Sequence, residues 1–369
     1  MELINYLYID DLLDEAKIIA KSRSNEFLEI DAIAPFEEDK KIRETIFKKY
    51  DGLILDQRLD DSQIYGLEKR GTAICQFLRT ISNENNTDFV SIPIILFTAS
   101  KYKDDFIREE TAHDLFDKVY FKGDYNQNMS KVLVSLAQGY KFIKTNKSLE
   151  AILNITANEI DEIDFRLIEK LKSELIENKA IHNFTLFFIK QVLDKNGALI
   201  DELVLAARLG IDITKNTTDW KLLVEEHLIE FQYKGVFSQA WKRWWMFKIE
   251  NWWVNEFGTK EHISEIDAEN RVKLINEKFK LNLIPAQKTE RSSSSQFWTI
   301  CQGTKQPIDI LDGIRIVQDL PQPWQDEQYI SIDELISEKN KGEYWKDVHP
   351  SDKIRSQEIK EKSIKIRKK

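Results

Sequence analysis

The chain has 369 residues, of which 42% are hydrophobic and 32% charged, and its formal net charge at pH 7 is −9. This composition excludes a largely disordered chain, and the length suffices for two or three domains. No apolar run approaches the roughly 18–20 residues of a membrane span, and the opening MELINYLYIDD lacks the basic start of a secretory signal. Because Cys75 and Cys301 are isolated, we expect no disulfide framework and a cytoplasmic protein.

The basic residues gather at the end of the chain. Residues 353–369 contain eight Lys or Arg and two Glu, although the chain as a whole is acidic. An acidic body is a poor general surface for nucleic acid, because it repels phosphates. We interpret the tail as a solvated and frayed terminus, with a contact to nucleic acid or to an acidic partner as the alternative.

The first 145 residues alternate short apolar runs with helical patterns. The apolar runs cover 3–9, 27–34, 53–55, 92–97 and 119–121. Patterns that predict helices cover 12–22, 39–49, 67–81, 103–115 and 128–143. Such alternation predicts βαβ units around a parallel sheet. The expected fold class is α/β, with a doubly wound five-stranded parallel sheet of flavodoxin-like order.

Polar side chains follow four of the five apolar runs directly. Asp10 and Asp11 follow the first run, Asp56 the third, Thr98 the fourth and Lys122 the fifth. Ligands of doubly wound sheets bind beyond the carboxyl ends of the strands, at the switch point. We therefore expect these five side chains to converge at one edge of the sheet.

Three carboxylates at such an edge suit a magnesium ion, which prefers oxygen ligands and keeps several waters. We expect Asp11 and Asp56 to bind Mg²⁺ directly and Asp10 to act through water. The backbone carbonyl of Arg58, two residues beyond Asp56, is a further expected ligand.

The same residues suit the transfer of a phosphoryl group to a carboxylate, which needs charge neutralisation and a fixed nucleophile. Asp56 is the expected nucleophile. Lys122 is expected to pair with the carboxylate and then with a phosphoryl oxygen, and Thr98 to hydrogen-bond another phosphoryl oxygen.

This set of residues resembles the receiver domain of two-component response regulators. The fragments that carry the resemblance are YIDD, LILDQRL, IILFTAS and VYFKG, over roughly residues 1–130. The resemblance implies a CheY-like domain that accepts a phosphoryl group on Asp56, with Mg²⁺, from a sensor histidine kinase, a phosphotransfer protein or a small phosphodonor. A receiver that keeps these residues without accepting phosphate is the alternative.

The chain also departs from the receiver pattern. Receivers usually have a proline after the lysine, where this chain has Gly123. They usually have an aromatic switch residue three positions before the lysine, where this chain has Val119; Tyr120 follows, on the opposite face of the strand. The turn at 59–61 lacks proline, an insertion precedes Gly71, and the connection 82–90 is long and polar. We expect an intact acid pocket with an unusual output surface.

After about residue 146 the pattern becomes mainly helical. Helices are predicted at 160–175, 184–193, 201–209, 220–231, 237–257 and 268–279, a flexible serine-rich loop at 287–296, short strands within 297–317 and a short helix at 333–339. We divide the chain into a receiver at 1–145, a Trp-rich helical effector or interaction domain at 146–286, and a loop, a small α+β segment and the basic tail at 287–369.

Two motifs in this second region suggest binding. The tryptophans of 237–257 recur at helical spacing, which favours a large core helix over an aromatic platform for a nucleobase or partner helix. The stretch DELVLAARLGIDI looks like the first half of a helix-turn-helix, with Ala206 four residues before Gly210. The helix that follows is acidic, so DNA binding is disfavoured.

The sequence predicts a response-regulator-like signalling protein whose output is a protein–protein interaction of the C-terminal region or a phosphate-sink role. The alternatives are a DNA-binding transcription regulator with a divergent effector and a receiver-regulated effector enzyme. No enzymatic activity is predicted beyond phosphorylation and dephosphorylation of the receiver aspartate. Expected partners are the kinase or phosphotransfer protein, a downstream protein and a second copy of the chain, with no membrane contact.

Overall fold

The computed structural model describes residues 2–35, 49–59, 70–83, 91–102, 114–123, 128–177, 180–317, 320–337 and 343–367. The helices predicted at 39–49 and 103–115 and the connection 82–90 lie largely outside these residues. The described chain forms two compact units. The first comprises Met1–Ile160, Ile168–Lys190 and Lys234–Trp241, and the second comprises Asp161–Leu167, Gln191–Tyr233 and Lys242–Lys369.

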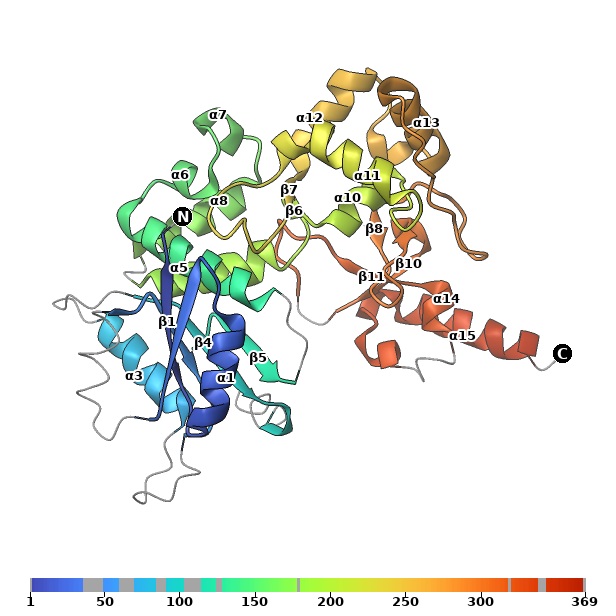
Figure 1. Ribbon diagram of the computed structural model, residues 1–369. Coiled ribbons are helices and arrows are strands. Elements are labelled where there is room, and N and C mark those ends of the chain that lie inside the picture. Colours follow the sequence, from blue (N-terminus) through green and yellow to red (C-terminus); the bar gives the residue numbers. More distant parts are fainter. Residues whose placement is uncertain are drawn as a thin grey trace. The chain divides into compact units, whose positions relative to one another are not determined.

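The first unit contains a five-stranded sheet, shown with its helices in Figure 1. Its strands are β1 Ile4–Ile9, β2 Leu28–Ile33, β3 Gly52–Leu55, β4 Ile94–Ala99 and β5 Lys118–Lys122. All neighbouring strands run parallel, in the order β2-β1-β3-β4-β5. This is the flavodoxin-like order, so the predicted fold class is confirmed. Residues of β3 and nearly all of β4 are buried, as expected for a sheet covered on both faces.

Helices cover the two faces of this sheet. They are α1 Leu13–Arg23, α3 Gly71–Asn83 and α5 Met129–Thr145. The face that carries Leu7 and Ile9 packs against Leu78 of α3. On the opposite face, the hydroxyl of Tyr6 donates a 2.8 Å hydrogen bond to the carbonyl of Leu133 in α5. Alternate residues of β1 therefore face different helical layers.

A buried polar cluster lies at the amino end of β5, away from the carboxyl ends of the strands. Asp117 accepts hydrogen bonds from Arg79 at 2.8 Å, from the Tyr140 hydroxyl at 2.5 Å and from the Ile94 amide at 2.8 Å. His182 Nδ1 lies 3.3 Å from the same carboxylate. Burial alone would raise the pKa of Asp117, but the charge of Arg79 leads the effects that lower it to about 2. The cluster therefore connects α3, α5 and helix α9, Ile181–Phe188, to the sheet.

The rest of the chain is rich in helix. Its helices are α6 Leu149–Leu153, α7 Ala157–Ile160, α8 Phe165–Glu177, α9 Ile181–Phe188, α10 Glu202–Leu209, α11 Thr217–Leu223, α12 Met246–Phe257, α13 Ala268–Phe279, α14 Ile332–Leu335 and α15 Lys353–Arg367. Short π-helical segments, Ile189–Leu193 and Val224–Leu228, extend α9 and α11. None of the helices in the described part of the chain is long and apolar enough to span a membrane.

Short antiparallel strand pairs complete the second unit. They are β6 Leu199–Ile200 with β7 Trp244–Trp245, β8 Thr299–Ile300 with β9 Pro307–Ile308, and β10 Gly313–Ile316 with β11 Gln328–Ser331. The predicted strands within 297–317 are thus confirmed. In the preceding loop, Ser293 and Ser294 hydrogen-bond to Asp312 and Asp309, which fixes this serine-rich segment to the strands.

The prediction of one helix over 237–257 is wrong for the first half of that range. Only Met246–Phe257 is helical, and Trp244 and Trp245 form β7 instead. Phe237 has a φ of +66°, in the left-handed region that an α-helix cannot include. The spacing of the tryptophans fits a helical period, but pairing with β6 determines the backbone around Trp244.

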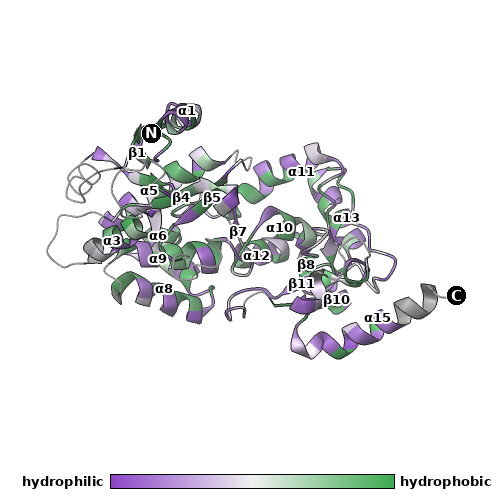
Figure 2. Cartoon of the chain, turned by 90° about the horizontal axis from the view of Figure 1, so that it is seen from below, coloured by the Kyte–Doolittle hydropathy of each residue, from purple (hydrophilic) through white to green (hydrophobic). Residues whose placement is uncertain are grey.

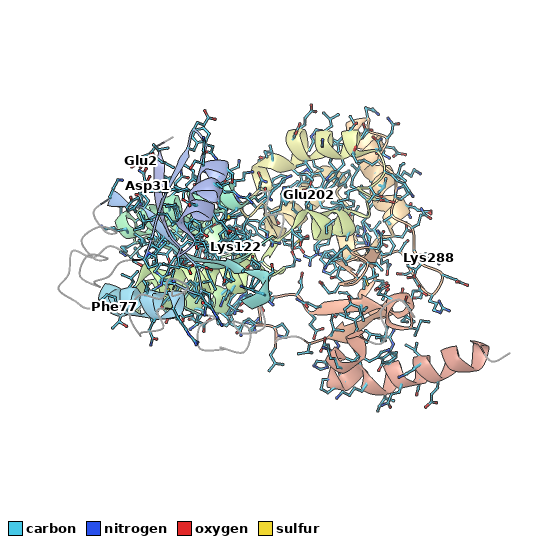
Figure 3. The ribbon with its side chains drawn as sticks, turned by 60° about the horizontal axis from the view of Figure 1, so that its bottom comes forward. Glu2, Asp31, Phe77, Lys122, Glu202 and Lys288 are labelled. Carbon is cyan, nitrogen blue, oxygen red and sulfur yellow. The ribbon has the colours of Figure 1, made fainter. Side chains whose placement is uncertain are left out.

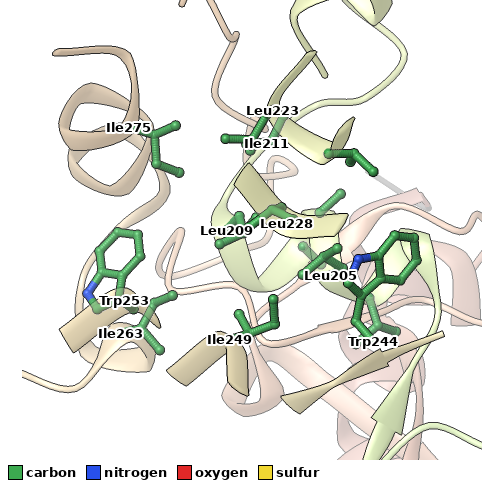
Figure 4. Packing of buried hydrophobic residues seen from close by; sticks show 14 of the residues in the cluster. Leu205, Leu209, Ile211, Leu223, Leu228, Trp244, Ile249, Trp253, Ile263 and Ile275 are labelled. Carbon is green, nitrogen blue, oxygen red and sulfur yellow. The ribbon is translucent and has the colours of Figure 1, made fainter. Parts of the chain in front are cut away.

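The tryptophans nevertheless belong to the core, as the favoured interpretation expected. Trp244, Trp252 and Trp253 are buried in one hydrophobic cluster with residues of α10, α11 and α13. Figure 4 shows Trp244 and Trp253 at two sides of this cluster, with Leu205 and Leu209 between them. Burial of such large side chains leaves them no exposed platform for stacking on a nucleobase.

The basic tail forms helix α15. Figure 2 shows purple, hydrophilic residues interspersed with green ones along this helix. Its first turn is anchored, because Arg355 donates to the carbonyls of Gly313 and Leu311. The described part of the tail is therefore attached to the strands that precede it, which modifies the expectation of a frayed terminus.

Candidate functional site at the carboxyl end of the sheet

The predicted site residues converge at the carboxyl ends of adjacent strands. Asp10 and Asp11 follow β1, Asp56 follows β3, Thr98 lies near the end of β4, and Lys122 ends β5. Carboxylate oxygens of the three aspartates, one from each, lie within 4.8 Å of one another. Figure 3 marks Lys122 in this unit. The strand order places β1, β3, β4 and β5 side by side, which brings the five side chains together.

Lys122 links two of the aspartates. Its Nζ lies 2.7 Å from Asp10 Oδ2 and 3.3 Å from Asp56 Oδ2. Burial disfavours the ammonium, but the hydrogen bond to Asp10 and the charge of Asp56 outweigh this effect and raise the pKa of Lys122. Lys122 is therefore positively charged and is held between the two carboxylates.

Asp56 is buried, with 5% of its surface exposed. Its Oδ1 accepts a 2.8 Å hydrogen bond from the amide of Gln57. Burial raises the pKa of Asp56, and the charge of Asp10 acts in the same direction, whereas Lys122 opposes them. A carboxylate in this setting gains from any further cation that enters the site.

Thr98 has an unused hydroxyl in the same pocket. The residue is 0% exposed, and its Oγ1 forms no hydrogen bond of good geometry with protein atoms, although it lies near enough to Asp56 to lower the pKa of that carboxyl. Buried hydroxyls are usually paired. This hydroxyl is thus available to an oxygen-bearing ligand bound at Asp56.

The segment after Asp56 folds back close to that residue. Arg58 and Arg70 form an isolated antiparallel bridge, and the amide of Gly71 donates to the carbonyl of Gln57 at 3.0 Å. A Cβ on Gly71 would lie 2.2 Å from the carbonyl oxygen of Asp56, so only glycine fits there. The role of the Arg58 carbonyl as a metal ligand remains a prediction.

The residues around Lys122 that depart from the receiver pattern fit the local backbone and the alternation of β5. Gly123 has a φ of +99°, which proline cannot adopt because its ring holds φ near −65°. Val119 packs into the cluster that contains Leu7 and Ile9. Tyr120 is buried near Tyr6 on the other face of the sheet, as the alternation of the strand predicted.

Sequence reasoning missed one residue of this pocket. Tyr8 is buried, and its hydroxyl donates a hydrogen bond to Asp10 Oδ2, the oxygen that also accepts from Lys122 Nζ. The signal was present, since residues two apart in a strand share one face, and Tyr8 stands two positions before Asp10.

The helix-turn-helix-like segment forms two helices, α10 and α11, joined through Gly210. Gly210 has a φ of +75° and closes the C-terminus of α10. The second helix begins at Thr217, and the side chain of Asn216 caps it by accepting a hydrogen bond from the Asp219 amide. The second helix with its π-helical extension is acidic, and its negative charges would repel the phosphates of DNA. DNA binding by this helix therefore remains disfavoured.

Comparisons with known proteins concern the first third of the chain. No family model and no curated protein matches the chain. A sensor protein from Polaromonas sp. JS666 is 14% identical, with a TM-score of 0.29, over 37% of this chain and 98% of its own. A CheY-like receiver domain from Methylobacillus flagellatus is 18% identical, with a TM-score of 0.25, over 33% of this chain and 88% of its own.

A third solved structure contains a ligand. The response regulator TrrA from Thermotoga maritima, in complex with Mg²⁺ and BeF, is 20% identical, with a TM-score of 0.25, over 34% of this chain and 93% of its own. These structural neighbours are CheY-like receiver domains that match the N-terminal part of the chain, and the C-terminal region has no recognised counterpart.

Proposed function

We propose that this chain accepts a phosphoryl group on Asp56 in a Mg²⁺-dependent reaction and acts as a response-regulator-like signalling protein. The observation that carries the proposal is the pocket itself. It places three carboxylates, a paired lysine and the unused Thr98 hydroxyl at the switch point of a doubly wound sheet.

The donor atoms fit Mg²⁺. The carboxylates of Asp10, Asp11 and Asp56 are hard oxygen ligands within reach of one ion. Asp11 and Asp56 would bind Mg²⁺ directly, together with the Arg58 carbonyl, and Asp10 would act through water. Bound Mg²⁺ supplies positive charge that offsets the negative charge of the phosphoryl oxygens.

The chain's own residues define the transfer. A carboxylate oxygen of Asp56 attacks the phosphorus of the donor, and the bond from phosphorus to the donor's leaving atom breaks with its electron pair. Lys122, already 3.3 Å from Asp56 Oδ2, then pairs with a phosphoryl oxygen. The Thr98 hydroxyl donates a hydrogen bond to another phosphoryl oxygen.

The donor we propose is a sensor histidine kinase or a phosphotransfer protein, and acetyl phosphate is the small-molecule substitute for experiments. The output we propose is a protein–protein interaction of the C-terminal region, or a phosphate-sink role. Phosphorylation would act by shifting the receiver between two states that present different surfaces to a downstream protein or to a second copy of the chain.

The test is labelling of the full chain by acetyl phosphate, followed by intact-mass spectrometry. We expect the mass of one phosphoryl group to be added with Mg²⁺, and none to be added when EDTA removes the metal. Hydroxylamine, which cleaves acyl phosphates, should remove the label. Undiminished labelling in EDTA would contradict the proposal, as would absence of both labelling and beryllium fluoride binding at saturating Mg²⁺.

A further inference from the structure

Asp10 is a buried carboxylate of the pocket that accepts three hydrogen bonds. The residue is 0% exposed. Its Oδ1 accepts from the Leu12 amide at 2.9 Å. Its Oδ2 accepts from Lys122 Nζ at 2.7 Å and also from the Tyr8 hydroxyl. One oxygen of Asp10, Oδ2, therefore accepts two hydrogen bonds, and the Tyr8 hydroxyl donates one of them.

The orientation of the Tyr8 phenol is determined by its packing and by its hydrogen bond to Asp10. Its hydroxyl is buried together with the ring and donates to Asp10 Oδ2. The ring lies against Phe97 of β4, with centroids 6.0 Å apart. Packing on a central strand thus orients the phenol toward Asp10.

Tyr6 shows what a purely structural tyrosine does on the same strand. It stands two residues earlier, faces the same side, and is equally buried. Its hydroxyl donates to a backbone carbonyl of α5, that of Leu133, at 2.8 Å. Tyr6 therefore connects sheet to helix, whereas Tyr8 directs its hydroxyl at an acidic residue of the site.

We propose that Tyr8 is a positioning residue that holds Asp10 in the orientation needed for Mg²⁺ binding; the inference rests on the proposed function of this pocket. Without the phenol, the buried Oδ2 of Asp10 loses a donor, and the carboxylate rotates toward Lys122 to compensate. That rotation draws Asp10 away from the metal position. Partners that orient metal-binding side chains typically contribute 10- to 100-fold to metal affinity.

The test compares Tyr8→Phe with Tyr6→Phe in the full chain. Each substitution removes one buried hydroxyl from β1 and keeps the ring. Calorimetric titration with MgCl₂ should show at least a roughly tenfold weaker Mg²⁺ affinity for Tyr8→Phe, with Tyr6→Phe within about twofold of wild type. The rate of labelling by acetyl phosphate at saturating Mg²⁺ should equal that of the wild type in Tyr6→Phe, because the Tyr6 hydroxyl bonds to α5 and lies outside the pocket.

The outcomes separate this inference from the proposed function. Equal Mg²⁺ affinity of wild type and Tyr8→Phe, or tighter binding by Tyr8→Phe, would overturn the role of Tyr8 and leave phosphoacceptance intact. Equal weakening in both variants would also overturn it, since it would indicate a general loss of stability. A wild-type chain that binds no Mg²⁺ would instead overturn the proposed function.

Discussion

Asp56→Asn is expected to abolish phosphoryl labelling of the full chain by acetyl phosphate and Mg²⁺. The amide keeps the shape of the side chain but removes the nucleophilic carboxylate. Because Asp56 is buried beside Lys122, no neighbouring carboxylate has the same position relative to the lysine and the Thr98 hydroxyl. Intact-mass spectrometry of the variant should show only unmodified protein under conditions that label the wild type.

Asp51→Asn is the matched control for this experiment. Asp51 precedes the same strand, β3, at its opposite end, where its side chain accepts from the amide of Asn5 at 2.9 Å and pairs with Lys141 at 2.9 Å. The substitution also removes one carboxylate next to β3, but it lies away from the pocket. Labelling of Asp51→Asn should equal that of the wild type, and equal labelling of Asp56→Asn would refute the assignment of the nucleophile.

Asp117→Asn is expected to lower the free energy of unfolding of the first unit by about 3 to 5 kcal/mol, because it leaves the guanidinium of Arg79 buried without its counter-charge. Arg79 and Asp117 are both buried, and their closest atoms are 2.8 Å apart. The substitution also weakens the bonds to Tyr140 and His182. Urea unfolding followed by circular dichroism measures the loss.

Asp31→Asn provides the control for charge removal at a surface. Asp31 pairs with Lys49 at 2.8 Å, but the two side chains are 39% and 66% exposed. Exposed pairs contribute roughly 0 to 1 kcal/mol, so this variant should unfold almost as the wild type does. A loss for Asp117→Asn no greater than that for Asp31→Asn would show that the buried cluster does not stabilise the unit.

The same cluster predicts an acid sensitivity. The pKa of Asp117 is about 2 in the folded chain, below its ordinary value of 3.8. Because the pKa is lower in the folded than in the unfolded chain, the ionised carboxylate stabilises the fold at any pH above the ordinary pKa. This stability is lost as the pH falls from about 4 to about 2. Wild-type stability should therefore fall over this interval through Asp117, and the stability difference from Asp117→Asn should narrow there.

The strands and the pocket could be predicted from the sequence because both depend on local patterns. Each buried strand is a short apolar run, and each run ends at a polar residue that the parallel sheet brings to one edge. Asp10, Asp11, Asp56, Thr98 and Lys122 therefore lie together as expected. Tyr8 could have been included, since it shares the face of Asp10.

Features that depend on distant partners could not be predicted in this way. The Asp117 cluster joins Arg79, Tyr140 and His182, which are far apart in sequence and carry no shared motif. The backbone at Trp244 follows its pairing with β6, which overrides the helical spacing of the tryptophans. The three predicted domains and the two boundaries between them remain predictions about independently folding segments.

The central claim is that Asp56 is the phosphoryl acceptor of this chain. Its most direct test is identification of the labelled residue in the wild-type protein, by borohydride reduction of the acyl phosphate followed by peptide mass spectrometry. We expect homoserine at position 56 as the single new product, formed only when Mg²⁺ and acetyl phosphate are both present. Reduction at Asp10 or Asp11 with an unmodified Asp56, or recovery of a label that resists hydroxylamine on another residue type, would contradict the claim.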